Sequence, residues 1–288
     1  MKTSVAAVSI LLCISAVSLH AQTCVEAYGV PYRIIDGKEL QMDIQRPEPV
    51  GVPKPAIVFL CGNGWGYERT LNREGFWYGL DLATQRGYVA VTVDYSSSSE
   101  NNNGRPTGIF PAQIHDVKSA IRFLRAHAGA YDIDPARIGV IGYSSGGNLA
   151  LLLGLTVPSD GLEGQDDNLQ YPSSVQAVVN LSGATDLAAW NREPVVSTYL
   201  GGSLQARPEQ FRRASPVTYA RPGTPPILTV HGEKDLVVSP EQALLLDARM
   251  KEVGALHTLI IKKGLGHTDE IDQAVWDFLD TALKPAAK

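Results

Sequence analysis

The stretch that decides the fold is "IGVIGYSSGGNLALLLGL", which runs from Ile138 to Leu155. Its first part is a run of apolar, partly β-branched residues that ends at Gly142, and such a run predicts a buried strand. Its last part, "SGGNLALLLGL", is a long apolar stretch that predicts a buried helix. The chain therefore turns sharply from strand to helix at Ser144, a serine that stands between glycines.

Residues 142–146 match the pattern G-x-S-x-G. In such a turn the backbone is strained at the serine, small neighbours relieve the crowding, and the hydroxyl stands clear at the carboxyl end of the sheet. The start of the following helix offers free N–H groups and positive potential to an oxyanion. We therefore expect Ser144 to be a nucleophile, the alternative being that the glycines serve only to pack strand against helix.

A serine hydroxyl is a weak nucleophile that needs a base, and the base needs an orienting carboxylate. "ILTVHGEKDLVVSP" places Asp235 just past one buried strand, and "IIKKGLGHTDE" places His267 just past the next. The order Ser, Asp, His along the chain is that of the α/β hydrolases. We expect Ser144, Asp235 and His267 to meet at one edge of the sheet as catalytic residues.

Other titratable residues compete for these roles. His231 precedes Asp235 and is expected to be structural, and Asp186 is expected to shape its own turn. Asp269 and Glu270 follow His267 closely, but they are predicted to cap the last helix.

A tetrahedral intermediate needs two backbone N–H donors for its oxyanion. One is expected from Ser145, the residue after the nucleophile. The other is expected from the glycine-rich loop "CGNGW", residues 61–65, with Asn63 or Gly62 as the donor and Gly64 giving the loop its freedom. A plain turn is the alternative for this loop.

Apolar strands alternate with helical segments along the chain, and this pattern predicts a mostly parallel central sheet with helices on both faces. The fold class is therefore α/β, and the G-x-S-x-G turn with the order Ser, Asp, His predicts the α/β-hydrolase type. Examples are the apolar runs at 56–60 and 89–93 and the amphipathic helix at 111–128. Without a long linker, residues 22–288 are predicted to form a single catalytic domain.

The first residues, "MKTSVAAVSILLCISAVSLHAQT", have the layout of a secretory signal peptide, which we expect to be removed after residue 21. Their apolar run is shorter than the roughly 20 residues of a membrane span. The protein is thus expected to be secreted or periplasmic, with no membrane span in the mature chain. Cys24 and Cys61 then remain, and an oxidising compartment permits either a disulfide or two separate thiols.

The chain has 288 residues, a formal net charge of −5 and 44% hydrophobic residues, so it can bury a sizeable core. No basic patch favours a nucleic-acid partner. No C-x-x-C pattern or His/Cys cluster favours a metal or redox centre, and no cofactor is expected. The polar stretch 156–174 contains acidic residues whose spacing does not match an EF-hand, so we expect a solvated loop rather than a calcium site.

Several stretches together resemble a known group, among them "VTVDYS", "YDIDPARIGVIGYSSGGNLA", "PPILTVHGEKDLVV" and "GLGH". The chain resembles the α/β-hydrolase esterases related to hormone-sensitive lipase, and especially the acetyl-xylan and feruloyl esterase-like branch of carbohydrate esterases. The resemblance spans roughly residues 56–279 and implies the triad Ser144, Asp235 and His267, without metal or cofactor. One departure is C-G-N-G-W at residues 61–65, where the family usually has H-G-G-G-W.

The expected function is a secreted serine esterase that acts on acetyl or feruloyl groups of a plant polysaccharide such as xylan, or of an oligosaccharide. Residues expected to shape the substrate pocket are Trp65, Tyr67, Trp190 and Tyr199, the alternative being aromatic packing beneath loops. Two other functions fit less well. A peptidase of the prolyl-oligopeptidase type shares the triad order but usually adds a propeller domain, and a non-catalytic carbohydrate-binding module predicts a lost triad member.

Overall fold

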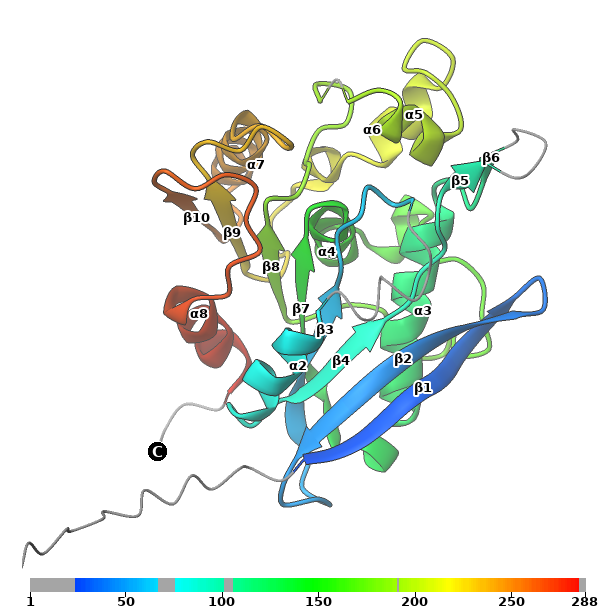
Figure 1. Ribbon diagram of the computed structural model, residues 1–288, viewed down its shortest axis with the longest axis vertical. Helices are drawn as coiled ribbons and strands as arrows, with labels where there is room; N and C mark the ends of the chain where they lie inside the picture. Colours follow the sequence, from blue (N-terminus) through cyan, green and yellow to red (C-terminus); the bar gives the residue numbers. More distant parts are fainter. Residues whose placement is uncertain (1–23, 67–75, 101–105, 191, 285–288) are drawn as a thin grey trace, which may run out of the picture.

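The computed structural model describes residues 24–66, 76–100, 106–190 and 192–284. Its centre is a sheet of eight strands in the order β1-β2-β4-β3-β7-β8-β9-β10, and the predicted α/β-hydrolase fold class is confirmed (Figure 1). The strands are β1 (Cys24–Ile35), β2 (Lys38–Pro47), β3 (Lys54–Leu60), β4 (Val89–Val93), β7 (Ile133–Tyr143), β8 (Ala177–Leu181), β9 (Ile227–Gly232) and β10 (His257–Lys262). A separate pair is formed by β5 (Ser99–Glu100) and β6 (Pro106–Thr107).

The six strands from β4 to β10 are mutually parallel, whereas β2 runs antiparallel to both of its neighbours. Because parallel strands present their carboxyl ends at one edge, the loops that follow β3, β7, β9 and β10 emerge on the same side of the molecule. These loops carry the residues that the sequence predicts to form the catalytic site, namely the 61–65 loop, Ser144, Asp235 and His267.

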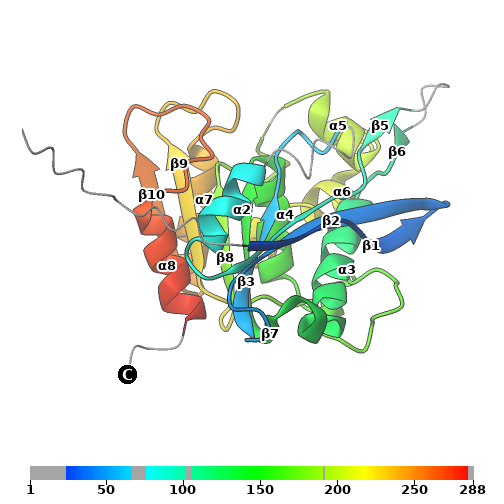
Figure 2. The same cartoon turned by 60° about the horizontal axis from the view of Figure 1, so that its bottom comes forward.

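Helices cover both faces of the sheet (Figure 2). The helices are α2 (Trp77–Thr84), α3 (Ala112–Ala126), α4 (Ser145–Leu155), α5 (Val195–Leu200), α6 (Pro208–Arg213), α7 (Glu241–Glu252) and α8 (Gln273–Leu283). Strand β3 shows the two-sided burial, since Val58 and Leu60 join the core beneath α3, α4 and α7, while Ile57 and Phe59 join the core beneath α2 and α8. Alternate side chains of a strand point to opposite faces, so a sheet covered on both sides needs continuous apolar strands.

The antiparallel hairpin of β1 and β2 has no counterpart among the strands predicted from the sequence. Leu40, Met42 and Ile44 of β2 are fully buried and seal that end of the core. The backbone N–H of Asp94, just after β4, donates to the carbonyl of Gln41 at 2.8 Å and extends the pairing. The hairpin thus closes the β4 side of the sheet, away from the predicted catalytic loops (Figure 1).

The predicted signal peptide, residues 1–21, lies outside the described residues. No helix in the part of the chain that the structure describes has the length and apolar character to cross a membrane. Cys24 and Cys61 are both free thiols. The Cys61 thiol is buried, and burial is the main cause that raises its pKa to about 11.

The loop at 156–174 differs from the solvated loop that was expected. Arg122 of α3 is buried and pairs with Asp166 and Glu163, and Lys118 pairs with Glu163 at 2.5 Å. Asp160 pairs with Arg221 at 2.7 Å. Three of the four acidic residues of the loop are therefore ion-pair partners that bind it to the body of the protein, while Asp167 is exposed.

Candidate active site

Ser144 lies at the turn between β7 and α4, with φ 55° and ψ −119°. A non-glycine residue rarely adopts positive φ, and such strain persists only where the surroundings impose it. The surroundings do so here, because a Cβ at Gly142 would overlap the backbone of Gly146, and a Cβ at Gly146 would overlap the carbonyl of Leu60. Residues 142–146 therefore form the sharp turn predicted from G-x-S-x-G.

Asp235 and His267 are brought together at the carboxyl ends of β9 and β10. The Nδ1–H of His267 donates to Oδ2 of Asp235 at 2.7 Å. The other oxygen, Oδ1, accepts the N–H groups of Val237 at 2.8 Å and Val238 at 2.9 Å. Both oxygens of the carboxylate are thus occupied, and its direction is fixed toward the imidazole.

The charge state of Asp235 follows from these contacts. Burial raises the pKa of its carboxyl group, but hydrogen bonds from His231 and His267 and from two backbone N–H groups outweigh burial. The pKa of Asp235 is therefore held well below its usual range, and the group is a carboxylate at neutral pH.

The competing residues have local roles. His231 is fully buried, with Nε2 2.8 Å from the carbonyl oxygen of Val238 and 3.2 Å from Oδ2 of Asp235. These contacts stabilise the turn that carries Asp235, as expected of a structural residue. Oδ1 of Asp186 accepts the N–H of Ala188 at 3.0 Å and shapes its own turn.

His267 packs against the residue that precedes Ser144, and its loop is tied to the strand beside β7. Its ring centroid lies 4.8 Å from that of Tyr143, the residue that precedes Ser144. The hydroxyl of Ser182, at the end of β8, donates to the carbonyl of Thr268 at 3.0 Å, which ties the His267 loop to the strand beside β7. Since Nδ1 is engaged by Asp235, Nε2 is the nitrogen available to a serine hydroxyl.

The loop at residues 61–65 packs directly on the turn at residues 142–146, which we call the elbow. A Cβ at Gly62 would lie 2.6 Å from Cβ of Ser144, so only glycine fits. The backbone N–H of Asn63 donates to Oγ of Ser145 at 2.9 Å. Gly64 has φ 68°, and Trp65 also has positive φ, 58°. The predicted oxyanion donors Gly62, Asn63 and Ser145 thus meet beside Ser144.

Tyr95 is a residue of this site that sequence reasoning missed. It is fully buried, and its hydroxyl donates to the carbonyl oxygen of Cys61 at 2.6 Å. This hydrogen bond fixes the start of the loop. Cys61 occupies the position where the resembled family usually has histidine. The signal in the sequence is the place of Tyr95 after the apolar strand in "VTVDYS".

Of the four residues expected to shape the substrate pocket, two are core residues. Trp65 and Tyr199 are fully buried and stack with ring centroids 4.1 Å apart and an interplanar angle of 1°. This burial indicates that they support the 61–65 loop and do not touch substrate directly. Trp190 is half-buried, and its Nε1–H donates to the carbonyl of Val237 at 3.2 Å, beside Asp235. Tyr67 lies outside the described residues.

The prediction that Asp269 and Glu270 cap the last helix is wrong. The N-cap of α8 is Asp272, whose side chain accepts from the backbone N–H groups of Ala274 and Val275. Oδ2 of Asp269 instead accepts from the hydroxyl of Tyr78 at 3.1 Å. The helix begins at Gln273, four residues after Asp269, because Asp272 supplies the side-chain acceptor that the first turn needs.

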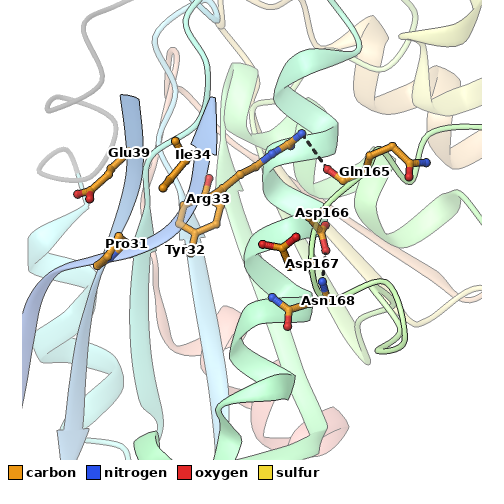
Figure 3. A pocket seen from close by; sticks show the side chains of 9 residues that line it. All are labelled: Pro31, Tyr32, Arg33, Ile34, Glu39, Gln165, Asp166, Asp167 and Asn168. Atoms are coloured by element: carbon orange, nitrogen blue, oxygen red, sulfur yellow. Dashed lines mark hydrogen bonds between the residues drawn. The ribbon is translucent and has the colours of Figure 1, made fainter. Parts of the chain in front are cut away.

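A large cavity lies away from these residues. It has a volume of about 610 Å³, and it is bordered by β1 and the 156–174 loop (Figure 3). Arg33 reaches across it to the carbonyl of Gln165 at 3.2 Å, and none of the predicted catalytic residues lines it. Within the described ranges, no group of three or more His, Cys, Asp or Glu side chains is arranged to hold a metal ion.

Known proteins with similar sequences are esterases. Esterase LipQ of Mycobacterium tuberculosis is 28% identical over 244 residues, which are 82% of this chain and 55% of LipQ. An isoprenylcysteine α-carbonyl methylesterase of Arabidopsis thaliana is 27% identical over 80% of this chain and 54% of its own length. The chain spans about half the length of the curated relatives that it matches.

Solved structures cover more of both chains. A truncated carbohydrate esterase from gut microbiota superposes with a TM-score of 0.78 at 27% identity, covering 89% of this chain and 94% of its own. Esterase 2 of the planctomycete Thermogutta terrifontis superposes with a TM-score of 0.70 at 25% identity, covering 90% and 94%. These similarities support a carboxylic ester hydrolase. The BD-FAE family matches residues 42–250, and the chain belongs to this family of α/β hydrolases related to hormone-sensitive lipase.

Proposed function

We propose that the protein is a secreted or periplasmic serine esterase that removes acetyl or feruloyl groups from a plant polysaccharide such as xylan. The observation that carries the proposal is the Asp235–His267 hydrogen bond of 2.7 Å, in a chain whose Ser144 is held at positive φ and whose His267 packs on Tyr143. A carboxylate fixed on both oxygens orients an imidazole, and an oriented imidazole activates a serine. The choice of a polysaccharide as the substrate is based on the family and on a carbohydrate esterase among the similar structures.

In the first half of the reaction, Nε2 of His267 takes the proton from Ser144 as the serine oxygen attacks the ester carbonyl. Asp235 stabilises the resulting imidazolium. The carbonyl oxygen becomes an oxyanion, which accepts hydrogen bonds from the N–H of Ser145 and the N–H of Asn63 or Gly62. The C–O bond to the alcohol then breaks, and the leaving oxygen takes the proton from His267.

In the second half, water attacks the acyl-enzyme. His267 takes a proton from the water, and the second tetrahedral intermediate collapses to the free acid and Ser144, which regains its proton from His267. Every proton moves through one imidazole nitrogen, so the chemistry asks for no metal or cofactor.

The test is release of acetate and ferulate from acetylated, feruloylated xylan by the mature protein beside Ser144→Ala. Release that vanishes in the variant supports both the serine and the substrate class, and the ratio of the two acids identifies the preferred ester. Release that persists in Ser144→Ala overturns the mechanism. Faster cleavage of dipeptide amides than of esters would support a peptidase instead.

A further inference from the structure

Three side chains gather at the loop that carries His267, and they are Tyr78, Tyr143 and Asp269. Asp269 follows His267 in the β10–α8 loop, Tyr78 belongs to α2, and Tyr143 ends β7. The Tyr78 hydroxyl donates to Oδ2 of Asp269 at 3.1 Å and lies 3.3 Å from its backbone oxygen. The ring of Tyr143 packs 4.8 Å from the ring of His267. Segments far apart in the sequence thus meet at one place.

The Asp269 carboxylate uses only part of its hydrogen-bonding capacity within the described residues, where its bond to Tyr78 ties its loop to α2. It does not cap α8, since Asp272 does. Among the described residues it forms no ion pair, and Tyr78 is the side chain that donates to it. The neighbouring Glu270, by contrast, lies 3.4 Å from Nζ of Lys262. A carboxylate with one phenolic partner retains free acceptor positions, because it can accept about four hydrogen bonds.

The cluster is open to solvent. Tyr78 is 43% exposed, and Tyr143 and Asp269 are half-buried. The charge of Asp269 also acts on Tyr143, which supports placing the two residues in one cluster. Burial, followed by the negative charge of Asp269, raises the pKa of Tyr143 to about 12. The phenol therefore stays protonated at neutral pH and remains a hydrogen-bond donor.

The chemistry of the site says which half of an ester reaches this cluster. Nδ1 of His267 is bound to Asp235, so Nε2 delivers the proton to the leaving alcohol. The alcohol oxygen must therefore lie beside the His267 ring, within hydrogen-bond distance of Nε2. Tyr143 packs on that ring, and Asp269 lies two residues along the same loop, so both are close to the imidazole that serves the leaving alcohol.

We propose that Asp269, Tyr78 and Tyr143 form a subsite for the alcohol half of the ester, and that this alcohol is a polyol with adjacent hydroxyl groups, such as a sugar residue. This proposal rests on the esterase function proposed above. A carboxylate accepts charge-assisted hydrogen bonds from two neighbouring hydroxyls. The phenol of Tyr78 supplies a further polar contact, and the ring of Tyr143 offers an apolar face to the C–H groups of the sugar.

The experiment compares Asp269→Asn with the wild-type protein on two unactivated esters, acetylated xylo-oligosaccharide and ethyl acetate. Both have alkyl alcohols as leaving groups, but ethanol has no second hydroxyl. We expect KM for the oligosaccharide to rise about tenfold, which is the size of one lost charge-assisted hydrogen bond. We expect kcat/KM for ethyl acetate to stay within about twofold of wild type. Glu270→Gln, which removes the same charge one residue away, is the matched control and should leave both substrates unaffected.

Equal losses on both esters would show that Asp269 acts through His267, and would overturn the subsite. An unchanged KM for the oligosaccharide would overturn it as well. Tyr78→Phe removes only a hydroxyl and should raise the oligosaccharide KM in the same direction. Failure of the proposed function looks different, because Ser144→Ala would then still hydrolyse ethyl acetate.

Discussion

The backbone N–H of Asn63 donates a 2.9 Å hydrogen bond to the side-chain oxygen of Ser145, the residue that follows the elbow serine. An N–H group has one hydrogen, so it can make a full-strength hydrogen bond to an oxyanion only when it does not donate to another acceptor. The Ser145 hydroxyl therefore competes with an oxyanion for the N–H of Asn63, one of the two donors predicted from the 61–65 loop.

This competition predicts that Ser145→Ala makes the enzyme faster. The alanine keeps the backbone N–H of residue 145 and removes only the competing oxygen. We expect kcat/KM for p-nitrophenyl acetate to rise about fivefold, corresponding to a net hydrogen bond of about 1 kcal/mol. Phenylboronic acid, which forms a tetrahedral adduct with a serine, should bind more tightly by a similar factor. A lower kcat/KM would mean that the hydroxyl is needed to hold the loop.

Gly62→Ala is predicted to disable the site through a steric overlap. Its Cβ would meet Cβ of Ser144 at 2.6 Å and overlap the backbone of Tyr143, so the loop or the elbow has to move. Loss of one oxyanion donor costs about 10²- to 10³-fold in kcat, and we expect a fall of at least that size. Gly129→Ala is the control, because a Cβ there meets nothing within 4 Å. Near-normal turnover by Gly62→Ala, measured beside an unchanged Tm for Gly129→Ala, would refute this placement of the loop.

Asp235→Asn is predicted to lower kcat by about 10⁴-fold, the loss typical of this change in a Ser-His-Asp triad. An amide NH₂ turned toward His267 cannot accept the Nδ1–H, so the imidazole loses its tautomer and its orientation. Asp186→Asn is a suitable control, since Asp186 serves only its own turn. Steady-state kinetics of both variants on one acetyl ester decide the question, and equal effects would contradict the assignment of Asp235.

Asp166→Asn is predicted to destabilise the fold at neutral pH. Asp166 accepts hydrogen bonds from the buried Arg122, which keeps Glu163 as its second partner when Asp166 is changed. Loss of a hydrogen bond between charged groups costs about 1.5–3 kcal/mol of unfolding free energy. Glu209→Gln breaks an exposed Arg212 pair and serves as the control, with no measurable change expected. Urea titrations of the three proteins measure the difference.

The same pair sets a pH dependence. Burial raises the pKa of Asp166, but hydrogen bonds from Arg122 and from the Asn168 N–H outweigh it, so the folded-state pKa is lowered. A carboxyl group with a lowered pKa stabilises the fold above its unfolded pKa, near 4, and this contribution is lost as the pH falls through the folded value. The gap between wild type and Asp166→Asn should therefore narrow below about pH 4. A gap that stays constant to pH 3 would contradict the role of the charge.

The elements that sequence reasoning could place are those whose signal is local. The apolar run before Ser144 and the glycines around it specify a strand, a turn and a helix within one short segment, and the parallel order then places Asp235 and His267 at the same edge. Tyr78 and Asp269 lie 191 positions apart, and no local pattern indicates that they meet. The contact of Asn63 with Ser145 depends on a side-chain rotamer, which the sequence does not reveal.

The β1–β2 hairpin escaped notice for a different reason. Only residues 39–45 of β2 alternate polar with apolar, and β1 includes Gly29 and Pro31, which weaken a strand signal. The alternation fits an antiparallel strand with one buried face, whereas the continuous apolar runs of the parallel strands are easier to recognise.

The fit of Gly62 against Ser144 has a consequence for anyone who would redesign this enzyme. The loop at residues 61–65 and the elbow pack so closely that neither can move alone, although 82 positions separate Asn63 from Ser145. A loop grafted from a relative would have to fit an elbow with which it did not evolve. Libraries that vary substrate preference should therefore exchange both segments together, or leave both intact and diversify the outer residues near Tyr78.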